Sequence, residues 1–85
     1  MNTHHYYTYI VKCSDDSYYT GVTNDLERRI AEHNGKFAPN SYTFTRRPVV
    51  LVFFEAFSSI EQAIAFEKQV KGWSRKKKEA IIANE

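Results

Sequence analysis

Tyr6–Val22, which reads YYTYIVKCSDDSYYTGV, is the stretch that decides the fold of this 85-residue chain. Residues 6–12 and 18–22 are rich in β-branched and aromatic residues and therefore predict two strands. Ser14–Ser17 (SDDS) lies between them and has the short polar residues that favour a turn. The stretch therefore predicts a hairpin of two antiparallel strands.

The residues after the hairpin predict a helix and then a long loop. Asn24 has the side chain of a helix cap, and Glu27, three residues later, completes the capping pattern. The helix is expected to run to about Asn34 and to end at Gly35. Residues 35–48 contain two prolines among polar residues and predict a loop.

A third strand and two further helices are predicted in the second half of the chain. Val49–Phe57 (VVLVFFEAF) is the most apolar run, and we expect it to be the central buried strand. Ser58 and Ser59 mark the start of the longest helix, which is expected to reach about Lys71. A glycine then breaks this helix, and residues 75–83 predict a short last helix that a serine caps.

The predicted order is β-β-α-β-α-α, an α+β arrangement in which a small, mainly antiparallel three-stranded sheet is flanked by helices. At this length we expect one domain over residues 1–85. The sequence has no apolar run near the roughly 18 residues that span a bilayer, and its start does not resemble a signal peptide. A single cysteine, Cys13, excludes an internal disulfide framework and a multi-cysteine zinc site. These features predict a cytoplasmic protein.

Positive charge is concentrated near the end of the chain. The chain as a whole has a formal charge of +2, whereas residues 68–85 carry six basic and two acidic side chains. Such a block is typical of a surface that meets polyanions, and it is also typical of a solvated helix end. If the block binds nucleic acid, the residues expected to contact phosphates are Lys71, Arg75, Lys76 and Lys77, with Arg46 and Arg47 of the predicted loop.

Polar residues also fall on faces that should be apolar. Glu67 lies in the middle of the apolar arc of its helix, next to Lys71. Three interpretations remain open for Glu67: an ion pair with Lys71 or an arginine, a place at the edge of the arc, or a cleft in which it binds a hard cation. Arg29 and His33 lie beside the core line of the first helix, where an arginine needs an anionic partner.

The hairpin carries a third unusual feature. Tyr9 alternates onto one face of the first strand, and Tyr19 and Gly21 share a face of the second. A glycine inside a strand indicates a bulge or a close approach of backbone or ligand. The tyrosines fit either cross-strand packing or a site.

Together, Tyr7-Thr8-Tyr9, Tyr19-Thr20-Gly21, Arg29 and Glu67 resemble the GIY-YIG nuclease domain, in particular its small stand-alone bacterial members. The resemblance extends over about residues 6–80. Its departures are Tyr7 in place of a glycine, Thr20 in place of an apolar residue, Val22 where some members have lysine, and His33 where some have tyrosine.

The resemblance implies a metal-dependent endonuclease that hydrolyses phosphodiester bonds in DNA, with repair or recombination as its setting. By resemblance, Glu67 would hold one divalent metal, Mg²⁺ or Mn²⁺, and Arg29 would bind the scissile phosphate. Tyr19 would activate or position the attacking water with support from Tyr9, and His33 would be an auxiliary or substitute base, since imidazole titrates near neutral pH.

Two other functions compete with this one. The first is a nucleic-acid-binding module of the same fold with little or no cleavage. The second is a protein-interaction or purely structural domain, in which Arg29 and Glu67 would pair with each other. The sequence leaves the oligomeric state and the choice between DNA and RNA open.

Overall fold

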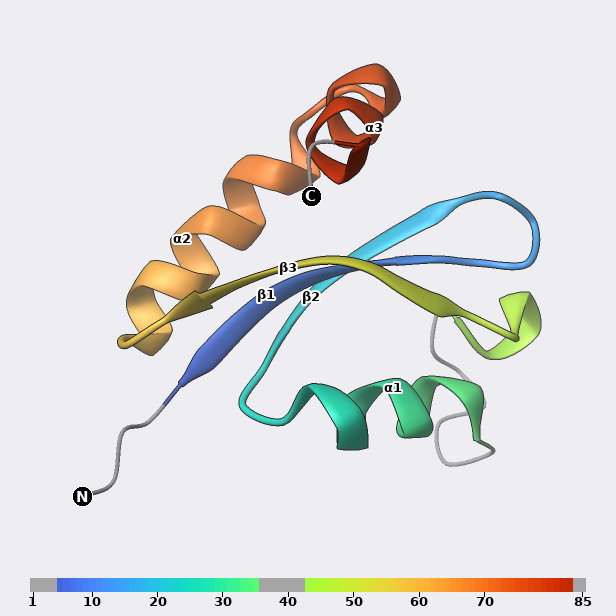
Figure 1. The fold of residues 1–85 in the computed structure, drawn as a ribbon, viewed down its shortest axis with the longest axis horizontal. Coiled ribbons are helices and arrows are strands. Elements are labelled where there is room, and N and C mark those ends of the chain that lie inside the picture. The colour runs from blue at the N-terminus through green and yellow to red at the C-terminus, as the bar shows by residue number, and fades with distance from the viewer. Residues whose placement is uncertain (1–4, 36–42, 84–85) are drawn as a thin grey trace.

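The computed structural model describes residues 5–35 and 43–83, and its elements follow the predicted order (Figure 1). The part of the predicted loop from residue 36 to residue 42 lies outside the described residues. A short 3-10 helix, η1, precedes the third strand and was not predicted. The elements are β1 (Tyr6–Lys12), β2 (Tyr18–Thr23), α1 (Leu26–Asn34), η1 (Phe44–Arg46), β3 (Val50–Phe57), α2 (Ile60–Lys71) and α3 (Arg75–Ala83).

The three strands form one antiparallel sheet in the order β2-β1-β3, which confirms the predicted fold class. The prediction that the third strand is central was wrong, because β3 is an edge strand and β1 lies in the middle. The side chains of Val50 and Phe54 in β3 are 61% and 45% exposed, whereas Tyr9 and Ile10 in β1 are fully buried. The apolar run predicts that these residues form a strand, but it does not predict whether that strand lies in the middle or at the edge of the sheet. The hairpin turn joins β1 to β2, and β3 pairs with the remaining edge of β1 rather than with the free edge of β2.

The helices cover opposite faces of this sheet (Figure 1). Under α1, the core consists of Tyr9, Val11, Cys13 and Val49, with Leu26 and Ile30 of the helix packed against them. Under α2 and α3, the core consists of Ile10, Phe53 and Val70, against which Phe66 and Trp73 pack. A register shift allows β3 to serve both cores: Ile10 pairs with Phe53 while Val11 pairs with Leu51, which leaves Val52 as an extra residue.

The helix ends agree with the predicted stops but not with every predicted start. Asp25, and not Asn24, caps α1, because its side chain accepts a hydrogen bond from the backbone N–H of Arg28 at 3.1 Å. Asn24 instead accepts from the guanidinium of Arg28 at 3.2 Å. Ser59 caps α2 as predicted. The predicted stops at Gly35 and Gly72 are confirmed, and Ser74 accepts from the N–H of Lys77 at the start of α3.

The buried stripe of α2 is narrow. Ala63 and Val70 are fully buried, whereas Ile60 and Ile64 are 40% and 38% exposed. Trp73 is partly buried against the core on this side of the sheet and packs edge-to-face on Phe66, with ring centroids 6.0 Å apart. Within residues 5–35 and 43–83, the structure has no helix of the length and apolar character that crossing a membrane requires.

Candidate functional site

The candidate site begins at a close approach between β1 and β2. Tyr9 in the central strand lies directly opposite Gly21 in the edge strand β2. A Cβ atom at position 21 would lie 2.5 Å from the Tyr9 hydroxyl oxygen and 2.8 Å from the ring carbon that bears it. Only glycine leaves room for this ring, so the predicted close approach at Gly21 is made by a tyrosine side chain of the protein itself.

The Tyr9 hydroxyl is a hydrogen-bonding centre that joins two residues of α1. It lies 2.8 Å from Nε2 of His33, and it accepts a hydrogen bond from Nε of Arg29 at 3.3 Å. Arg29 and His33 are four residues apart and therefore project from the same side of the helix. The structure thus brings together three of the four residues expected to be catalytic.

His33 is enclosed on several sides. Its side chain is 6% exposed, and its Nδ1 atom lies 2.7 Å from Oγ1 of Thr43, a buried residue next to η1. The ring of Tyr19, the fourth residue, packs edge-to-face on the His33 ring with centroids 5.3 Å apart. Since both ring nitrogens contact protein groups, His33 in this arrangement holds Tyr9 and does not face a water molecule. The role of substitute base stays a prediction, and this geometry does not favour it.

Within the cluster of Tyr9, His33 and Arg29, the surroundings favour the uncharged forms of Tyr9 and His33 and the charged form of Arg29. Burial raises the pKa of Tyr9 above its ordinary value, although the neighbouring Arg29 acts in the opposite direction. Burial, together with the positive charge of Arg29, lowers the pKa of His33 below its ordinary value of 6.5. The hydrogen bond to Tyr9 raises the pKa of Arg29 further. At neutral pH the cluster therefore consists of a phenol, a neutral imidazole and a guanidinium.

Arg29 reaches from this cluster to the surface. Its Nη1 atom donates to Oε1 of Glu32 at 3.1 Å, and Arg28 contacts the other oxygen of the same carboxylate. Both arginines line one open hollow that extends to Val22. Glu32 lies three residues after Arg29 and four after Arg28, so its carboxylate is placed to pair with both.

Glu67 forms an ion pair with Lys71, one of the three interpretations that the sequence left open. Nζ of Lys71 lies 3.0 Å from Oε2 of Glu67, whose side chain is 19% exposed. Because Arg29 pairs with Glu32 and Glu67 with Lys71, the structure does not show the Arg29–Glu67 pair of a purely structural domain. Besides burial, the charge of Glu67 contributes to the raised pKa of Tyr9, so Glu67 lies within electrostatic reach of the cluster.

A divalent cation would find one carboxylate here. Among residues 5–35 and 43–83, no group of three or more histidine, cysteine, aspartate or glutamate side chains could hold a metal ion. Mg²⁺ nevertheless keeps most of its waters and is commonly held by one or two carboxylates together with substrate phosphates. The oxygen of Glu67 therefore fits such an ion, provided that Lys71 releases it.

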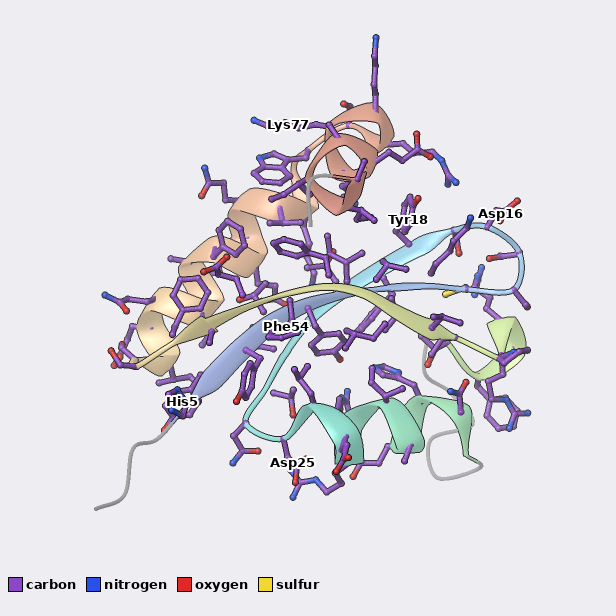
Figure 2. All side chains as sticks on the ribbon, in the orientation of Figure 1. His5, Asp16, Tyr18, Asp25, Phe54 and Lys77 are labelled. Carbon is purple, nitrogen blue, oxygen red and sulfur yellow. The ribbon has the colours of Figure 1, made fainter. Side chains whose placement is uncertain are left out.

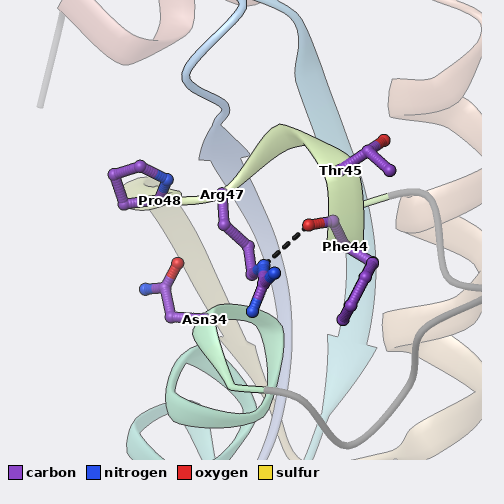
Figure 3. A pocket seen from close by; sticks show the side chains of 5 residues that line it. All are labelled: Asn34, Phe44, Thr45, Arg47 and Pro48. Carbon is purple, nitrogen blue, oxygen red and sulfur yellow. Dashed lines mark hydrogen bonds between the residues drawn. The ribbon is translucent and has the colours of Figure 1, made fainter.

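The two arginines expected on the loop have partners within the protein. Nε of Arg46 pairs with Asp15 of the hairpin at 3.0 Å. Arg47 folds back toward α1, where it donates from Nε to the carbonyl of Phe44 at 2.6 Å and from Nη1 to the carbonyl of Gly35 at 2.9 Å (Figure 3). Its guanidinium also lies 4.1 Å from the centroid of the Phe44 ring. Arg47 therefore links the C-terminal end of α1 to the segment that precedes β3 through these hydrogen bonds.

The basic residues near the end of the chain lie on the opposite side of the sheet from α1. Figure 2 shows Lys77 on α3, whereas Asp25 lies at the start of α1. Nζ of Lys77 lies 4.6 Å from the centroid of the Trp73 ring, and the guanidinium of Arg75 lies 4.6 Å from that of Tyr18. These two cations are held on aromatic rings, and Lys76 is exposed beside them. We define Lys71, at the end of α2, together with Arg75, Lys76 and Lys77 of α3 as the α3 basic surface.

The sequence interpretation missed two residues of the site. Glu32 could have been found from its spacing, because a carboxylate three and four residues after two arginines on a helix is placed to pair with both. Thr43 had no detectable signal. It meets His33 only because the chain returns to the end of α1 after a loop, and neither local propensity nor periodicity reports such a return.

Comparisons with known proteins agree with this geometry. The model of the GIY-YIG catalytic domain matches residues 5–80. The chain is 48% identical over 83 residues to the UPF0213 protein YazA of Bacillus subtilis, covering 96% of this chain and 82% of that one. It is 54% identical over 78 residues to a UPF0213 protein of Staphylococcus haemolyticus, covering 91% of this chain and 93% of that one.

Two solved structures are also similar. The solution structure of a UPF0213 protein from Bacillus halodurans has a TM-score of 0.61 and 39% identity, covering 95% of this chain and 85% of that chain. The solution structure of a protein from E. faecalis has a TM-score of 0.64 and 33% identity, covering 98% and 88%. With its tyrosines, Gly21 and Arg29 arranged around one edge strand, the chain belongs to the GIY-YIG family.

Proposed function

We propose that this protein is a metal-dependent endonuclease that hydrolyses phosphodiester bonds in DNA. The observation that carries the proposal is the way in which Arg29 is held. Its Nε atom is fixed by the buried Tyr9 hydroxyl, and its side chain, which also pairs with Glu32, lines an open surface hollow. A guanidinium anchored at one edge and accessible at the other is suited to hold a phosphate while charge develops on it.

The tyrosine and histidine behind Arg29 keep it in place. Neutral His33 fixes the Tyr9 hydroxyl, and that hydroxyl fixes Nε of Arg29. Because burial keeps the Tyr9 phenol un-ionised, it adds no negative charge that would repel the phosphate. A cation that is already held in position stabilises a transition state more strongly than a mobile one does, because it needs no reorganisation as charge develops.

Tyr19 is the residue proposed to orient the attacking water and receive its proton. Its ring rests on His33 while the residue itself is only half-buried, so part of Tyr19 is accessible from solvent. The same contact keeps Tyr19 within the charge field of Arg29, whose raised pKa reflects Tyr19 as a minor contribution after Tyr9 and Glu32.

Glu67 is the residue proposed to hold Mg²⁺ or Mn²⁺. Bound there, the ion would supply Lewis-acid stabilisation of the phosphate. Lys71 neutralises the carboxylate in the free protein and would become available for a DNA phosphate when the ion pair opens. Glu67 and Lys71 are thus proposed to separate on substrate binding.

One observation favours a second candidate, a nucleic-acid-binding module without cleavage. The single carboxylate of the proposed metal site is already paired with Lys71, and the described residues provide no cluster of three metal ligands. In such a module the α3 basic surface would bind nucleic acid while Glu67 serves only as the counter-ion of Lys71.

A cleavage screen separates the two candidates. Single-stranded, duplex, flap and junction DNA would be incubated with the protein and Mg²⁺ or Mn²⁺, with EDTA as the blank. We expect cleavage of at least one substrate that depends on the metal. Binding to these substrates without cleavage of any of them would support the module instead.

Glu67→Gln is the decisive variant, because it keeps the shape of the side chain and removes the anionic ligand. We expect it to bind DNA, to bind no Mn²⁺ and to lose cleavage. Since Lys71 is half-exposed, the lost ion pair should reduce the free energy of unfolding by no more than about 1 kcal/mol. The matched control is Glu55→Gln, at an exposed position on the opposite edge strand, which should cleave like the wild type. Full cleavage by Glu67→Gln would contradict the assignment.

A further inference from the structure

Arg28 and Arg29 hold one carboxylate between them. Nη1 of Arg29 lies 3.1 Å from Oε1 of Glu32, and Nε of Arg28 lies 3.7 Å from Oε2. Each oxygen of a single anion is thus turned toward a different guanidinium. A phosphodiester also presents two charged oxygens, so the arrangement is the one that a backbone phosphate would take between two arginines.

These residues belong to an open hollow where the end of β2, the start of α1 and the start of α2 meet. Besides Arg28, Arg29 and Glu32, its lining includes Val22, Asn24 and Ile60. Nη2 of Arg28 donates to Oδ1 of Asn24 at 3.2 Å, so Arg28 is oriented at two points. Arg29 is oriented by Tyr9 and Glu32. Both guanidiniums are therefore positioned before any ligand arrives.

The contact with Glu32 is weak enough to be replaced. The side chains of Arg28 and Glu32 are 60% and 39% exposed, and exposed ion pairs of this kind contribute little to stability. A phosphate that entered the hollow would meet two arginines and would be repelled by Glu32. The Glu32 side chain is 39% exposed, so its carboxylate can turn outward into water when a phosphate displaces it.

We propose that Arg28 and Arg29 form a phosphate-binding pair for the nucleic-acid backbone, and that Glu32 is an internal counter-ion which a backbone phosphate displaces. The ligand class is a backbone phosphodiester held by Arg28 and Arg29 together, and because Arg29 is also the residue proposed to hold the phosphate during cleavage, this inference rests on the proposed function. Glu32 then sets the affinity of the site, because any anion has to compete with it.

Binding of a fluorescently labelled duplex, measured by anisotropy in EDTA at low salt, tests the pair without any cleavage. Glu32→Gln keeps a hydrogen-bond acceptor for Arg29 but removes the competing charge, so we expect affinity to rise about threefold to tenfold. The matched control is Glu27→Gln, which makes the same charge change at an exposed position of the same helix. We expect its affinity to change by less than about twofold.

A second pair of variants tests whether the two arginines act together. Arg28→Gln should weaken binding by about threefold or more, and the gain from Glu32→Gln should be smaller in that background than in the wild type. Inorganic phosphate provides a small probe. In Glu32→Gln, the side-chain Nε–H resonances of Arg28 and Arg29 should respond at lower phosphate concentrations than in the wild type. Melting curves confirm that each variant is folded.

The outcomes separate this inference from the proposed function. Equal affinities of Glu32→Gln and Glu27→Gln would overturn the phosphate pair, even if the protein cleaves DNA. Weaker binding by Glu32→Gln would also overturn it, since Glu32 would then be needed to orient Arg29. The expected order of affinities in a protein that cleaves none of the substrates would support the pair and overturn the endonuclease.

Discussion

Gly21 is the residue on which the geometry of the site depends most directly. Its missing side chain makes room for the Tyr9 ring, and Tyr9 in turn holds both Arg29 and His33. We expect Gly21→Ala to reduce the free energy of unfolding by about 1–3 kcal/mol, because the new methyl group overlaps a fully buried ring on a central strand. Urea denaturation measures this change.

Gly72 provides the matched control for Gly21. A Cβ at position 72 would have its nearest neighbour, the carbonyl oxygen of Gln69, at 3.5 Å, which is an ordinary contact. The backbone at Gly72 has φ −84°, which any residue adopts. Gly72→Ala should therefore be neutral or stabilise the fold by up to about 1 kcal/mol. Equal destabilisation by the two variants would show that crowding of Tyr9 is not the cause.

His33 should make stability depend on pH. Burial and the charge of Arg29 lower its pKa in the folded protein, while Glu32 acts in the opposite direction. Between the folded pKa and the ordinary value of 6.5, the unfolded chain therefore binds a proton that the native protein does not. The stabilisation from neutral His33 is fully present above about pH 6.5 and is lost as the pH falls through this window.

Melting temperatures measured from pH 8 to pH 5 check this dependence. We expect His33→Gln to lose part of the decrease that the wild type shows below about pH 6.5. His5→Gln is the control, because it removes a histidine at an exposed position just before β1. Parallel curves for the wild type and His33→Gln would contradict a role for His33 titration.

At the scale of elements, α1 is tied to the segment that precedes β3. Nδ1 of His33 meets Thr43, and the side chain of Asn34 donates to the carbonyl of Val49 at 3.1 Å and accepts from its N–H at 2.7 Å. Arg47 adds a bond to the carbonyl of Gly35. The end of α1 is therefore positioned by hydrogen bonds to a distant part of the chain, and His33 with it.

Thr43→Val tests this connection, because it removes the hydroxyl and keeps the shape. The His33 nitrogen that faced Thr43 would lose a buried hydrogen bond, at a cost of about 1–3 kcal/mol in the free energy of unfolding. Thr43→Ser keeps the hydroxyl and should cost about 1 kcal/mol or less. The ¹⁵N shifts of the His33 ring should change in Thr43→Val and not in Thr43→Ser. Similar losses and unchanged shifts in both variants would mean that the contact only fills space.

At the scale of the whole molecule, charge is divided between two sides of the sheet. The helix α1, which carries Arg28 and Arg29, lies on one side, and α3, which carries most of the α3 basic surface, lies on the other (Figure 1). Both helix layers adjoin β2 at the edge of the sheet, since Tyr19 packs toward α1 and α2 lies against β2. A nucleic acid that contacts both charged regions would have to pass along this edge, next to the candidate site.

Salt dependence tests the α3 basic surface. Each phosphate contact contributes roughly 0.9 to the slope of log affinity against log salt concentration. Lys76→Ala/Lys77→Ala should therefore flatten the slope for duplex DNA by up to about 1.8. Lys12→Ala/Lys68→Ala removes the same charge from two exposed positions outside the predicted contacts and should change the slope much less. Equal slopes for the two double variants would mean that only net charge matters.

Most of the fold was accessible from the sequence because it depends on local patterns. The polar turn between two β-branched runs, the serine before α2 and the glycines after two helices each act over a few residues. The predicted cap of α1 was wrong because Asn24 and Asp25 are adjacent and have similar preference for the cap position. The position of β3 was also mistaken, because the apolar content of a strand does not specify which edge it pairs with.

The sequence by itself determined the order of elements and the pairing of β1 with β2. It also identified the candidate catalytic and metal-binding residues, which are Tyr9, Tyr19, Arg29, His33 and Glu67. Only the tertiary structure decided how they are connected: that Tyr9 lies over Gly21, that His33 is closed off by Thr43, and that Glu32 joins the two arginines. The physical reason is range. Propensity, capping and turn chemistry act between near neighbours, whereas burial and hydrogen bonding between distant segments exist only after the chain has closed its loops.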